Sequence, residues 1–183
     1  MAIAKYKASF SEYHQGSTRY IHILSAPISE TKDPVISQDD VEKIRLARDK
    51  SSKRLPSKLV FHGSNQSDKA KELKQMAKRL KRSVCLIDCQ MLQNKYIGET
   101  EKNLSKLVAQ AESENWILFF DEADALFGKR SKVEPNHNKF ANQQVSYLFR
   151  RLSEYKGMSI LSLTDDSVLD RIKYAIDSVI NFR

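Results

Sequence analysis

Short, continuous apolar runs separated by longer amphipathic segments mark most of the chain. Five such runs occupy residues 59–62, 83–88, 116–121, 159–164 and 177–182. Their apolar residues are consecutive rather than alternating, which is the pattern of strands that are buried on both faces of a sheet. The pattern therefore predicts five buried strands.

Segments with helical periodicity lie between these runs. Apolar residues recur at three- and four-residue spacing in residues 69–82, 99–114 and 138–155. An alternation of strands and helices predicts an α/β fold, in which helices cover both faces of a parallel sheet. Ligands of such sheets bind at the carboxyl ends of the strands, so functional residues are expected at that edge.

The N-terminal part of the chain has a different character. We interpret residues 1–55 as an extension packed on a main domain of residues 56–183. Residues 20–29 have strand character, and Ser37 to Asp40 resemble a capping box that opens a helix to about residue 51. The beginning of the chain lacks the apolar stretch of a secretory signal, and no apolar run is long enough to cross a membrane. We expect a cytoplasmic protein.

The formal net charge is +8, and much of the excess lies in residues 69–82. A basic, solvated helix face is the simpler interpretation, and a surface for nucleic acid or an acidic partner is the alternative. No aromatic residue lies between these lysines, which argues against a stacking platform for single strands.

The potential metal-binding residues do not form a recognisable ligand pattern. Cys85 and Cys89 lie in an apolar run without a nearby histidine, and the histidines are scattered along the chain. Cysteines in such a run are typically core residues. We predict that both cysteines belong to the core.

The segment GSNQSDKA, residues 63–70, follows the first predicted strand and precedes the first predicted helix. Gly63 and Lys69 have the spacing of a phosphate-binding loop, and the position between a strand and a helix is the one that such a loop requires. Asp68 stands where that motif has a glycine, and Ala70 stands where it has a hydroxyl. The candidate nucleotide-binding residues are Gly63, Ser64, Asn65, Gln66, Ser67, Asp68, Lys69 and Ala70.

The third predicted strand ends in two adjacent carboxylates, Asp121 and Glu122. In nucleotide hydrolases a strand that delivers two carboxylates to its carboxyl end builds a magnesium and water site. The first carboxylate holds the metal and the second polarises the attacking water. Acidic pairs after strands are common, so the identification depends on the sequence between the two motifs.

Taken together, these segments resemble the AAA+ ATPases. Residues 94–130 are close to the family's consensus through the pore loop and the second nucleotide motif, the Walker B motif. Residues 137–161 resemble the helix and sensor strand that follow, and the similarity extends over about residues 58–182. Within the family, the sequence is similar to the AAA-type ATPases that accompany contractile phage-tail-like injection systems.

The resemblance implies a three-layer P-loop NTPase core, subunits that form rings, usually hexamers, and ATP with Mg²⁺ at the subunit interface. It assigns the metal to Asp121 and the catalytic base to Glu122. It also assigns a pore loop that grips a threaded polypeptide to Lys95, Tyr96, Ile97 and Gly98.

The sequence departs from the family at the phosphate loop, where Gln66, Asp68 and Ala70 replace Gly, Gly and Thr. Asp68 places an anion where a polyphosphate would lie, and two unit charges about 5 Å apart repel by roughly 3 kcal/mol at an effective dielectric of about 20. Ala70 lacks the hydroxyl that would bind Mg²⁺. We therefore expect ATP binding to be weak.

Further departures affect the sensor, the arginine fingers and the lid. Asp165 occupies the position of the catalytic asparagine that helps to place the attacking water in the family. With one deletion allowed, the arginine pair falls on Tyr174 and Ala175, while Arg171 and Lys173 are out of register. Because the sequence ends at Arg183, we expect the family's C-terminal helical lid to be absent.

Three functional hypotheses follow. The favoured one is an inactive or low-activity assembly or adaptor subunit, in a mixed ring with an active paralogue, that contacts a protein partner or polypeptide through its pore loop. The second is an active, ATP-hydrolysing remodelling protein for which Lys69, Asp121 and Glu122 suffice. The third is a basic nucleic-acid-binding module that uses residues 69–82. The first is favoured because Asp121, Glu122 and the pore loop are retained while the phosphate loop is not.

Overall fold

The computed structural model describes residues 4, 6, 10, 12–15, 19–25, 57–93, 97–127 and 135–183. The predicted helix that opens at Ser37 lies outside these residues.

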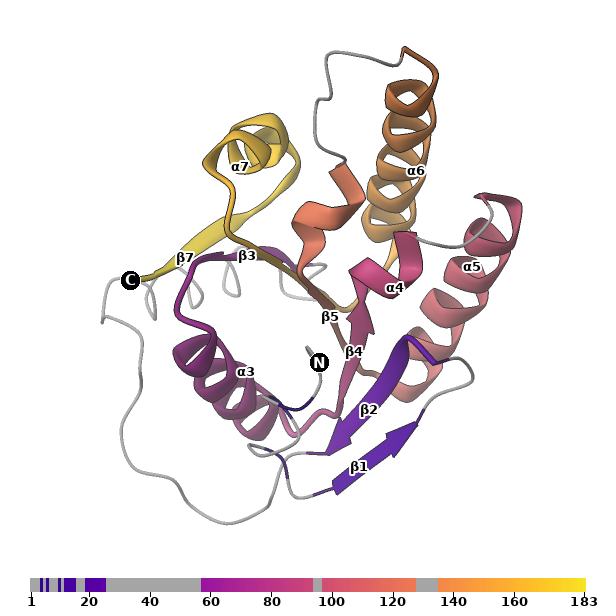
Figure 1. Ribbon diagram of the computed structural model, residues 1–183. Coiled ribbons are helices and arrows are strands. Elements are labelled where there is room, and N and C mark those ends of the chain that lie inside the picture. Colours follow the sequence, from indigo (N-terminus) through magenta and orange to yellow (C-terminus); the bar gives the residue numbers. More distant parts are fainter. Residues whose placement is uncertain are drawn as a thin grey trace.

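A seven-stranded sheet forms the centre of the protein, with the strand order β1-β2-β4-β5-β6-β3-β7 (Figure 1). The strands are β1 (Glu12–Gln15), β2 (Ile21–Ser25), β3 (Ser57–Gly63), β4 (Val84–Asp88), β5 (Ile117–Asp121), β6 (Met158–Leu163) and β7 (Ser178–Phe182). Strands β4, β5, β6, β3 and β7 pair in parallel. The five predicted strands and the parallel sheet are therefore confirmed.

The first two strands extend this sheet beyond β4. Strand β2 pairs with β4 and β1 pairs with β2, and both pairings are antiparallel. The backbone N–H of Asp88 also donates to the carbonyl oxygen of Tyr20 at 2.9 Å. The strand expected within residues 20–29 is thus present as β2. The division into residues 1–55 and 56–183 stays a prediction.

The helices are α3 (Gln66–Leu80), α4 (Cys89–Gln93), α5 (Ile97–Glu114), α6 (Pro135–Glu154) and α7 (Asp166–Ile172), with 3-10 helices η1 (Ala123–Phe127) and η2 (Lys173–Ala175). Helices α3, α5 and α6 confirm the three predicted helices, with ends that differ by no more than three residues. Helices α4 and α7 were not predicted, because they are too short to show a helical period. In the described part of the chain, no helix is both long and apolar enough to cross a bilayer.

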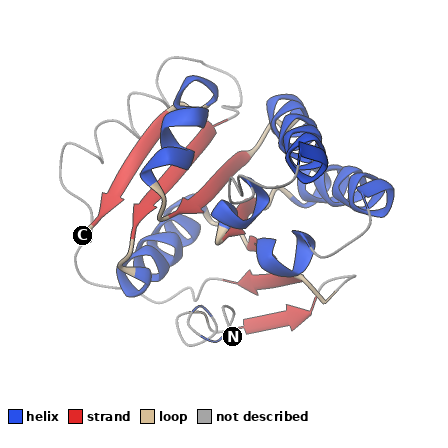
Figure 2. Ribbon diagram, turned by 45° about the horizontal axis from the view of Figure 1, so that its top comes forward, coloured by secondary structure: helices blue, strands red, loops and turns tan. Residues whose placement is uncertain are grey.

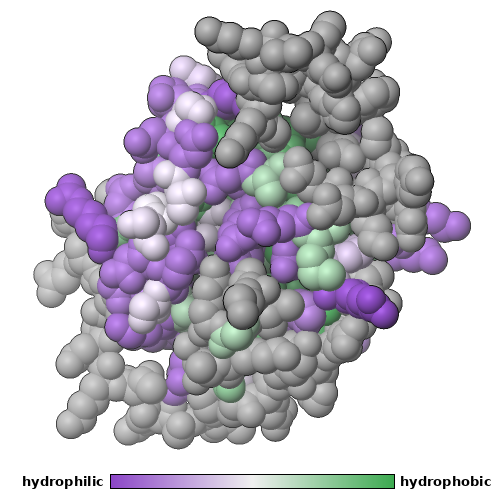
Figure 3. Space-filling model, viewed as in Figure 1, coloured by the Kyte–Doolittle hydropathy of each residue, from purple (hydrophilic) through white to green (hydrophobic). Residues whose placement is uncertain are grey.

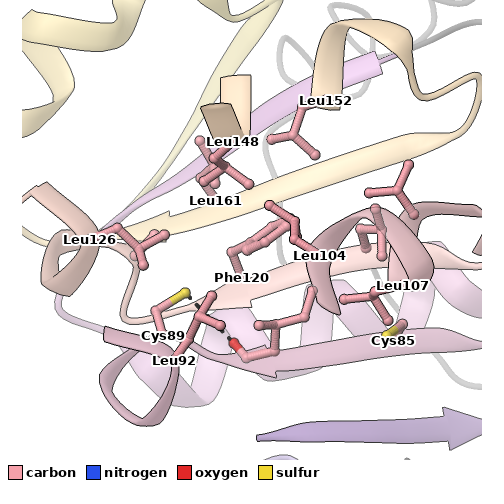
Figure 4. Packing of buried hydrophobic residues seen from close by; sticks show 14 of the residues in the cluster. Cys85, Cys89, Leu92, Leu104, Leu107, Phe120, Leu126, Leu148, Leu152 and Leu161 are labelled. Atoms are coloured by element: carbon pink, nitrogen blue, oxygen red, sulfur yellow. Dashed lines mark hydrogen bonds between the residues drawn. The ribbon is translucent and has the colours of Figure 1, made fainter. Parts of the chain in front are cut away.

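Helices cover both faces of the sheet and produce a three-layer arrangement (Figure 2). On one face, Phe120 packs in a cluster with residues of α5 and α6, including Leu104, Leu148 and Leu152 (Figure 4). On the other face, the neighbouring Phe119 packs in a second cluster with residues of α3. Consecutive side chains of a strand point to opposite faces, so one continuous apolar run supplies both cores.

The two cysteines lie in this core. Cys85 and Cys89 are buried and free, and both belong to the cluster shown in Figure 4. Burial raises the pKa of the Cys85 thiol to about 12. Among the described residues, no group of three potential ligands could hold a metal ion. The prediction that both cysteines are core residues is confirmed.

Candidate functional site

Strands β5, β6 and β3 are neighbours in the sheet and bring the predicted site residues to one edge. Gly63 is the last residue of β3, and Asp121 is the last residue of β5. Between them, β6 ends at Leu163. The strand order therefore gathers the Gly63 segment and the carboxylate strand at the carboxyl edge of the sheet, where ligands of α/β proteins bind.

Gly63 is at a position that only glycine fits. Its φ is +122°, a conformation that L side chains rarely adopt. A Cβ atom at this position would lie 1.8 Å from the carbonyl oxygen of Phe182 in β7. The close approach of the β7 backbone therefore requires glycine here, independently of any ligand.

The segment from Gly63 to Ala70 does not form an open loop. Strand β3 ends at Gly63 and helix α3 begins at Gln66, so only Ser64 and Asn65 connect them. The sequence pattern predicts that this helix starts at Lys69, and this boundary is wrong. The helix begins earlier because Asn65 caps it. Asn65 Oδ1 accepts the backbone N–H of Asp68 at 3.2 Å.

The Asp68 side chain completes this cap. Asn65 Nδ2 donates to Asp68 Oδ2 at 2.7 Å and to the carbonyl oxygen of Arg183 at 3.1 Å. Asp68 Oδ1 accepts from Lys71 Nζ at 2.9 Å. A carboxylate in the first turn of a helix also interacts favourably with the helix dipole. Asp68 therefore stabilises the first turn of α3.

Lys69 is completely buried against strand β6. Its ammonium group donates to Ser162 Oγ at 3.1 Å and to the carbonyl oxygen of Leu163 at 2.8 Å. A buried ammonium group requires such partners, because burial without them is costly. The next residue, Ala70, is buried in the second core cluster as an ordinary apolar side chain.

A tyrosine from the N-terminal part of the chain reaches the carboxylate of β5. The hydroxyl of Tyr6 donates to Asp121 Oδ1 at 2.8 Å and lies 3.5 Å from Gln66 Oε1. Burial and the negative charge of Asp121 hold the pKa of the Tyr6 phenol far above its usual range, so the phenol remains a proton donor. Tyr6 was not among the predicted site residues, because no local pattern in the sequence indicates this contact.

Glu122 follows β5 in a left-handed conformation, with a φ of +52°. This conformation is uncommon for a residue other than glycine, and such residues cluster at functional sites. The backbone N–H of Ala125 donates to the Glu122 carbonyl oxygen at 3.0 Å and begins η1. The turn that carries Glu122 is therefore fixed by the 3-10 helix that follows it.

Asp124 connects the end of β5 to the end of β6, and sequence analysis did not select it. Its carboxylate accepts the backbone N–H of Thr164 at 2.9 Å, the Thr164 hydroxyl at 3.0 Å and the backbone N–H of Asp165 at 3.1 Å. The available signal was the third acidic residue of the DEAD sequence, residues 121–124. Asp124 holds the turn after β6 against the turn after β5.

The side chain of Asp165 caps helix α7. Its Oδ1 atom accepts the backbone N–H of Ser167 at 2.8 Å. Hydrogen bonds from the side chain and the backbone of Ser167 hold the pKa of the exposed Asp165 carboxyl below its usual range. The catalytic role predicted for Asp165 stays a prediction, and the structure records a capping contact for its carboxylate.

The cationic residues near the expected arginine-finger positions contact their own neighbourhood. The guanidinium group of Arg171 lies 5.7 Å from the centre of the Phe127 ring. Lys173 Nζ lies 3.2 Å from Asp170 Oδ1. Tyr174, at a predicted finger position, is 89% exposed.

The predicted pore loop is described only in part. Lys95 and Tyr96 lie outside the described residues. Ile97 and Gly98 are the first residues of α5, which begins two residues earlier than predicted. The gripping role of this segment stays a prediction.

Glu72 is a second buried, ionisable residue of α3. Its side chain is fully buried, and neither carboxylate oxygen has a hydrogen-bond partner among the described residues. Burial raises the pKa of Glu72 to about 7, and the positive charge of Arg79 opposes this shift. The folded state therefore binds the proton of Glu72 more tightly than the unfolded state does.

Because of this raised pKa, the free energy of unfolding should fall as the pH rises through the interval from about 4.5 to about 7. We expect Glu72→Gln to stabilise the protein by about 2–3 kcal/mol at a pH above 7, and to have little effect below about pH 4.5. Urea denaturation across this range measures the difference. Glu114→Gln, at an exposed position, is the control, and an effect of Glu72→Gln that does not vary with pH would contradict the expectation.

Comparison with known proteins agrees with the fold. The model of the family described as "ATPase family associated with various cellular activities (AAA)" matches residues 59–176. This range contains both the segment from Gly63 to Ala70 and the Asp121–Glu122 pair. The matched range covers more than half of the chain.

One similar curated protein is the "Putative cell division cycle ATPase" of Plasmodium falciparum (isolate 3D7). It is 28% identical over 111 residues, which are 60% of this chain and 9% of the relative. The chain thus spans less than a tenth of the relative's length. On the extent of the family match, together with the parallel sheet and its site edge, this chain belongs to the AAA family of ATPases.

Proposed function

We propose that the chain is a AAA-family subunit with a silent nucleotide site, which acts in assembly or as an adaptor. Binding of ATP with Mg²⁺ is a general property of the family. The observation that carries the proposal is the closed form of the Gly63 segment, in which Gln66 to Ala70 are the first turn of α3.

This closed form does not fit a polyphosphate. A phosphate-binding loop directs its backbone N–H groups and its lysine at the phosphates. Here Asn65 accepts the backbone N–H groups of both Asp68 and Lys69, at 3.2 Å each. The Lys69 ammonium group donates to Ser162 and Leu163. Two of the backbone N–H groups of the segment and its lysine therefore have partners within the protein.

The residues also do not fit a magnesium ion. Ala70 offers no oxygen ligand, and Asp121 accepts a hydrogen bond from Tyr6. Because neither the phosphates nor the metal fit, we propose no hydrolytic step for the chain, and we expect any binding of ATP to be weak.

The assembly or adaptor role rests on what the chain retains. It keeps the AAA core, and its residues 95–98 match the family's pore-loop sequence. Through this segment we propose that it contacts a protein partner or polypeptide, in a mixed cytoplasmic ring with an active paralogue. A kinship with the ATPases of contractile injection systems is part of the same proposal and rests on residues 94–130.

The basic face of α3 is not needed for this role. Hydrophilic residues cover the outer side of α3 in Figure 3, as expected of a solvated helix face. Two of its cations have local partners, because Lys71 pairs with Asp68 and Arg79 donates to Gln75 at 3.2 Å. We therefore propose no nucleic-acid partner.

The alternative, an active ATPase, is tested by Glu122→Gln. In a silent subunit Glu122 has no attacking water to polarise, so the substitution should leave phosphate release from ATP at the background rate of the unmodified chain. In an active enzyme, loss of the general base should lower the rate by about 100-fold or more. Steady-state phosphate release with saturating MgATP measures this, and Glu114→Gln is the exposed control. Turnover above background that Glu122→Gln abolishes would refute the silent site.

A further inference from the structure

The hydrogen bond between Tyr6 and Asp121 joins residues that are 115 positions apart in the chain. We infer that the N-terminal segment around Tyr6 is an intramolecular ligand of the nucleotide site, and that its docking excludes a magnesium-bound nucleotide. The inference deepens the proposed function and rests on it, because it names what the silent site binds.

The position of the Tyr6 hydroxyl supports this exclusion. It lies 2.8 Å from Asp121 Oδ1, on the carboxylate at the end of β5, and 3.5 Å from Gln66 Oε1, at the start of α3. A magnesium ion keeps its ligands at about 2.0–2.1 Å and retains several waters, which require the space around the carboxylate. A phenol at hydrogen-bond distance from Asp121 Oδ1 occupies part of that space.

Apolar contacts hold the ring in place. Tyr6 is completely buried, and its ring centre lies 5.3 Å from that of Phe119 in an edge-to-face arrangement. It packs in the second core cluster with Phe61, Ala70 and Leu73. Phe10 is buried in the same cluster, so the segment has a second aromatic anchor. Aromatic side chains contribute most to such docking because each buries a large apolar area.

The docking has a regulatory consequence. A ligand that binds Asp121 at Oδ1 has to displace Tyr6, and displacement exposes the apolar surface that Phe119 shares with the ring. Nucleotide binding and release of Tyr6 are therefore linked. A molecule that binds only the state with Tyr6 docked, or only the state with Tyr6 released, shifts the equilibrium toward the state that it binds. A protein partner that captures the released segment would open the site.

The first experiment locates Tyr6 in solution by hydroxyl-radical footprinting of the full chain with detection by mass spectrometry. Tyr174 is the internal control, because it is the same residue type and is 89% exposed. We expect oxidation of Tyr6 to be slower than that of Tyr174 by about tenfold or more, as for a residue exposed only by local opening. Equal oxidation rates would overturn the inference.

The second experiment tests exclusion with full-length variants titrated with MgATP. We expect Tyr6→Ala to tighten binding by about tenfold or more, since the nucleotide then displaces nothing. Tyr6→Phe keeps the ring but loses the hydroxyl, so it should tighten MgATP binding by less than Tyr6→Ala does. It also tests the exclusion if Tyr6→Ala does not fold. Tyr147→Phe, which removes a hydroxyl that is hydrogen-bonded to Ser105, is the control. If Tyr6→Ala and Tyr6→Phe bind MgATP no more tightly than the unmodified chain and Tyr147→Phe do, the inference is overturned.

The two proposals fail in different ways. If the unmodified chain binds MgATP tightly and Tyr6 becomes oxidisable only when nucleotide is added, the silent site is wrong and the exclusion stands. If the unmodified chain binds no nucleotide and Tyr6 is oxidised as fast as Tyr174, the inference is wrong and the silent site stands.

Discussion

Gly63→Ala should destabilise the protein far more than a typical single substitution does. The added Cβ would lie 1.8 Å from the carbonyl oxygen of Phe182, and the φ of +122° disfavours any L side chain. Because backbone atoms clash, neither strand can yield by a simple change of rotamer. We expect a loss of more than about 4 kcal/mol, a large part of the 5–15 kcal/mol that stabilises a typical domain.

Circular dichroism during urea denaturation measures this loss. The control is Ser64→Ala, at the next position, where the side chain is exposed and a change of less than about 0.5 kcal/mol is expected. A Gly63→Ala variant within about 1 kcal/mol of the unmodified chain would show that β7 does not approach Gly63 this closely.

Repair of the phosphate loop should produce the largest change in nucleotide affinity. We expect Gln66→Gly, Asp68→Gly and Ala70→Thr together to tighten MgATP binding by well over about 100-fold, because loss of the Asp68 charge alone removes roughly 3 kcal/mol of repulsion, which corresponds to about 100-fold. The same change removes the carboxylate that closes the Asn65 cap at 2.7 Å, so the first turn of α3 can open into a loop. The restored hydroxyl supplies a magnesium ligand.

Calorimetric titration of the repaired and unmodified chains tests this prediction. The matched control is Asp68→Asn, which removes the charge but preserves a side chain that can cap the helix. It should gain only part of the affinity. An unchanged affinity in the repaired chain would show that residues 63–70 do not correspond to a phosphate loop.

The sequence predicted the parallel sheet well for a physical reason. A strand buried on both faces must be apolar at every position, as residues 117–121 are, and this leaves a continuous pattern that local analysis can read. The cap at Asn65 could also have been read, because an Asn followed three residues later by Asp68 can close a helix start reciprocally. This cap was not predicted, because the spacing of Gly63 and Lys69 favoured the interpretation of residues 63–70 as a phosphate-binding loop.

Contacts between distant residues left no such pattern. The docking of Tyr6 on Asp121 depends on how the N-terminal part of the chain packs across the folded sheet, and nothing near Tyr6 in the sequence specifies it. Asp124 was not predicted for a similar reason. Its carboxylate accepts backbone N–H groups of Thr164 and Asp165, which follow a different strand, β6. The sequence therefore predicted the edge of the sheet at which Gly63 and Asp121 lie, but not the contact that Tyr6 makes there.

Titration of the unmodified chain with MgATP tests the central claim most directly. Isothermal calorimetry should give a dissociation constant near or above the millimolar range, equivalent to about −4 kcal/mol or weaker. This result follows from a Gly63 segment that forms a capped helix start and from a Lys69 ammonium group that is buried against β6. Micromolar binding would contradict the account.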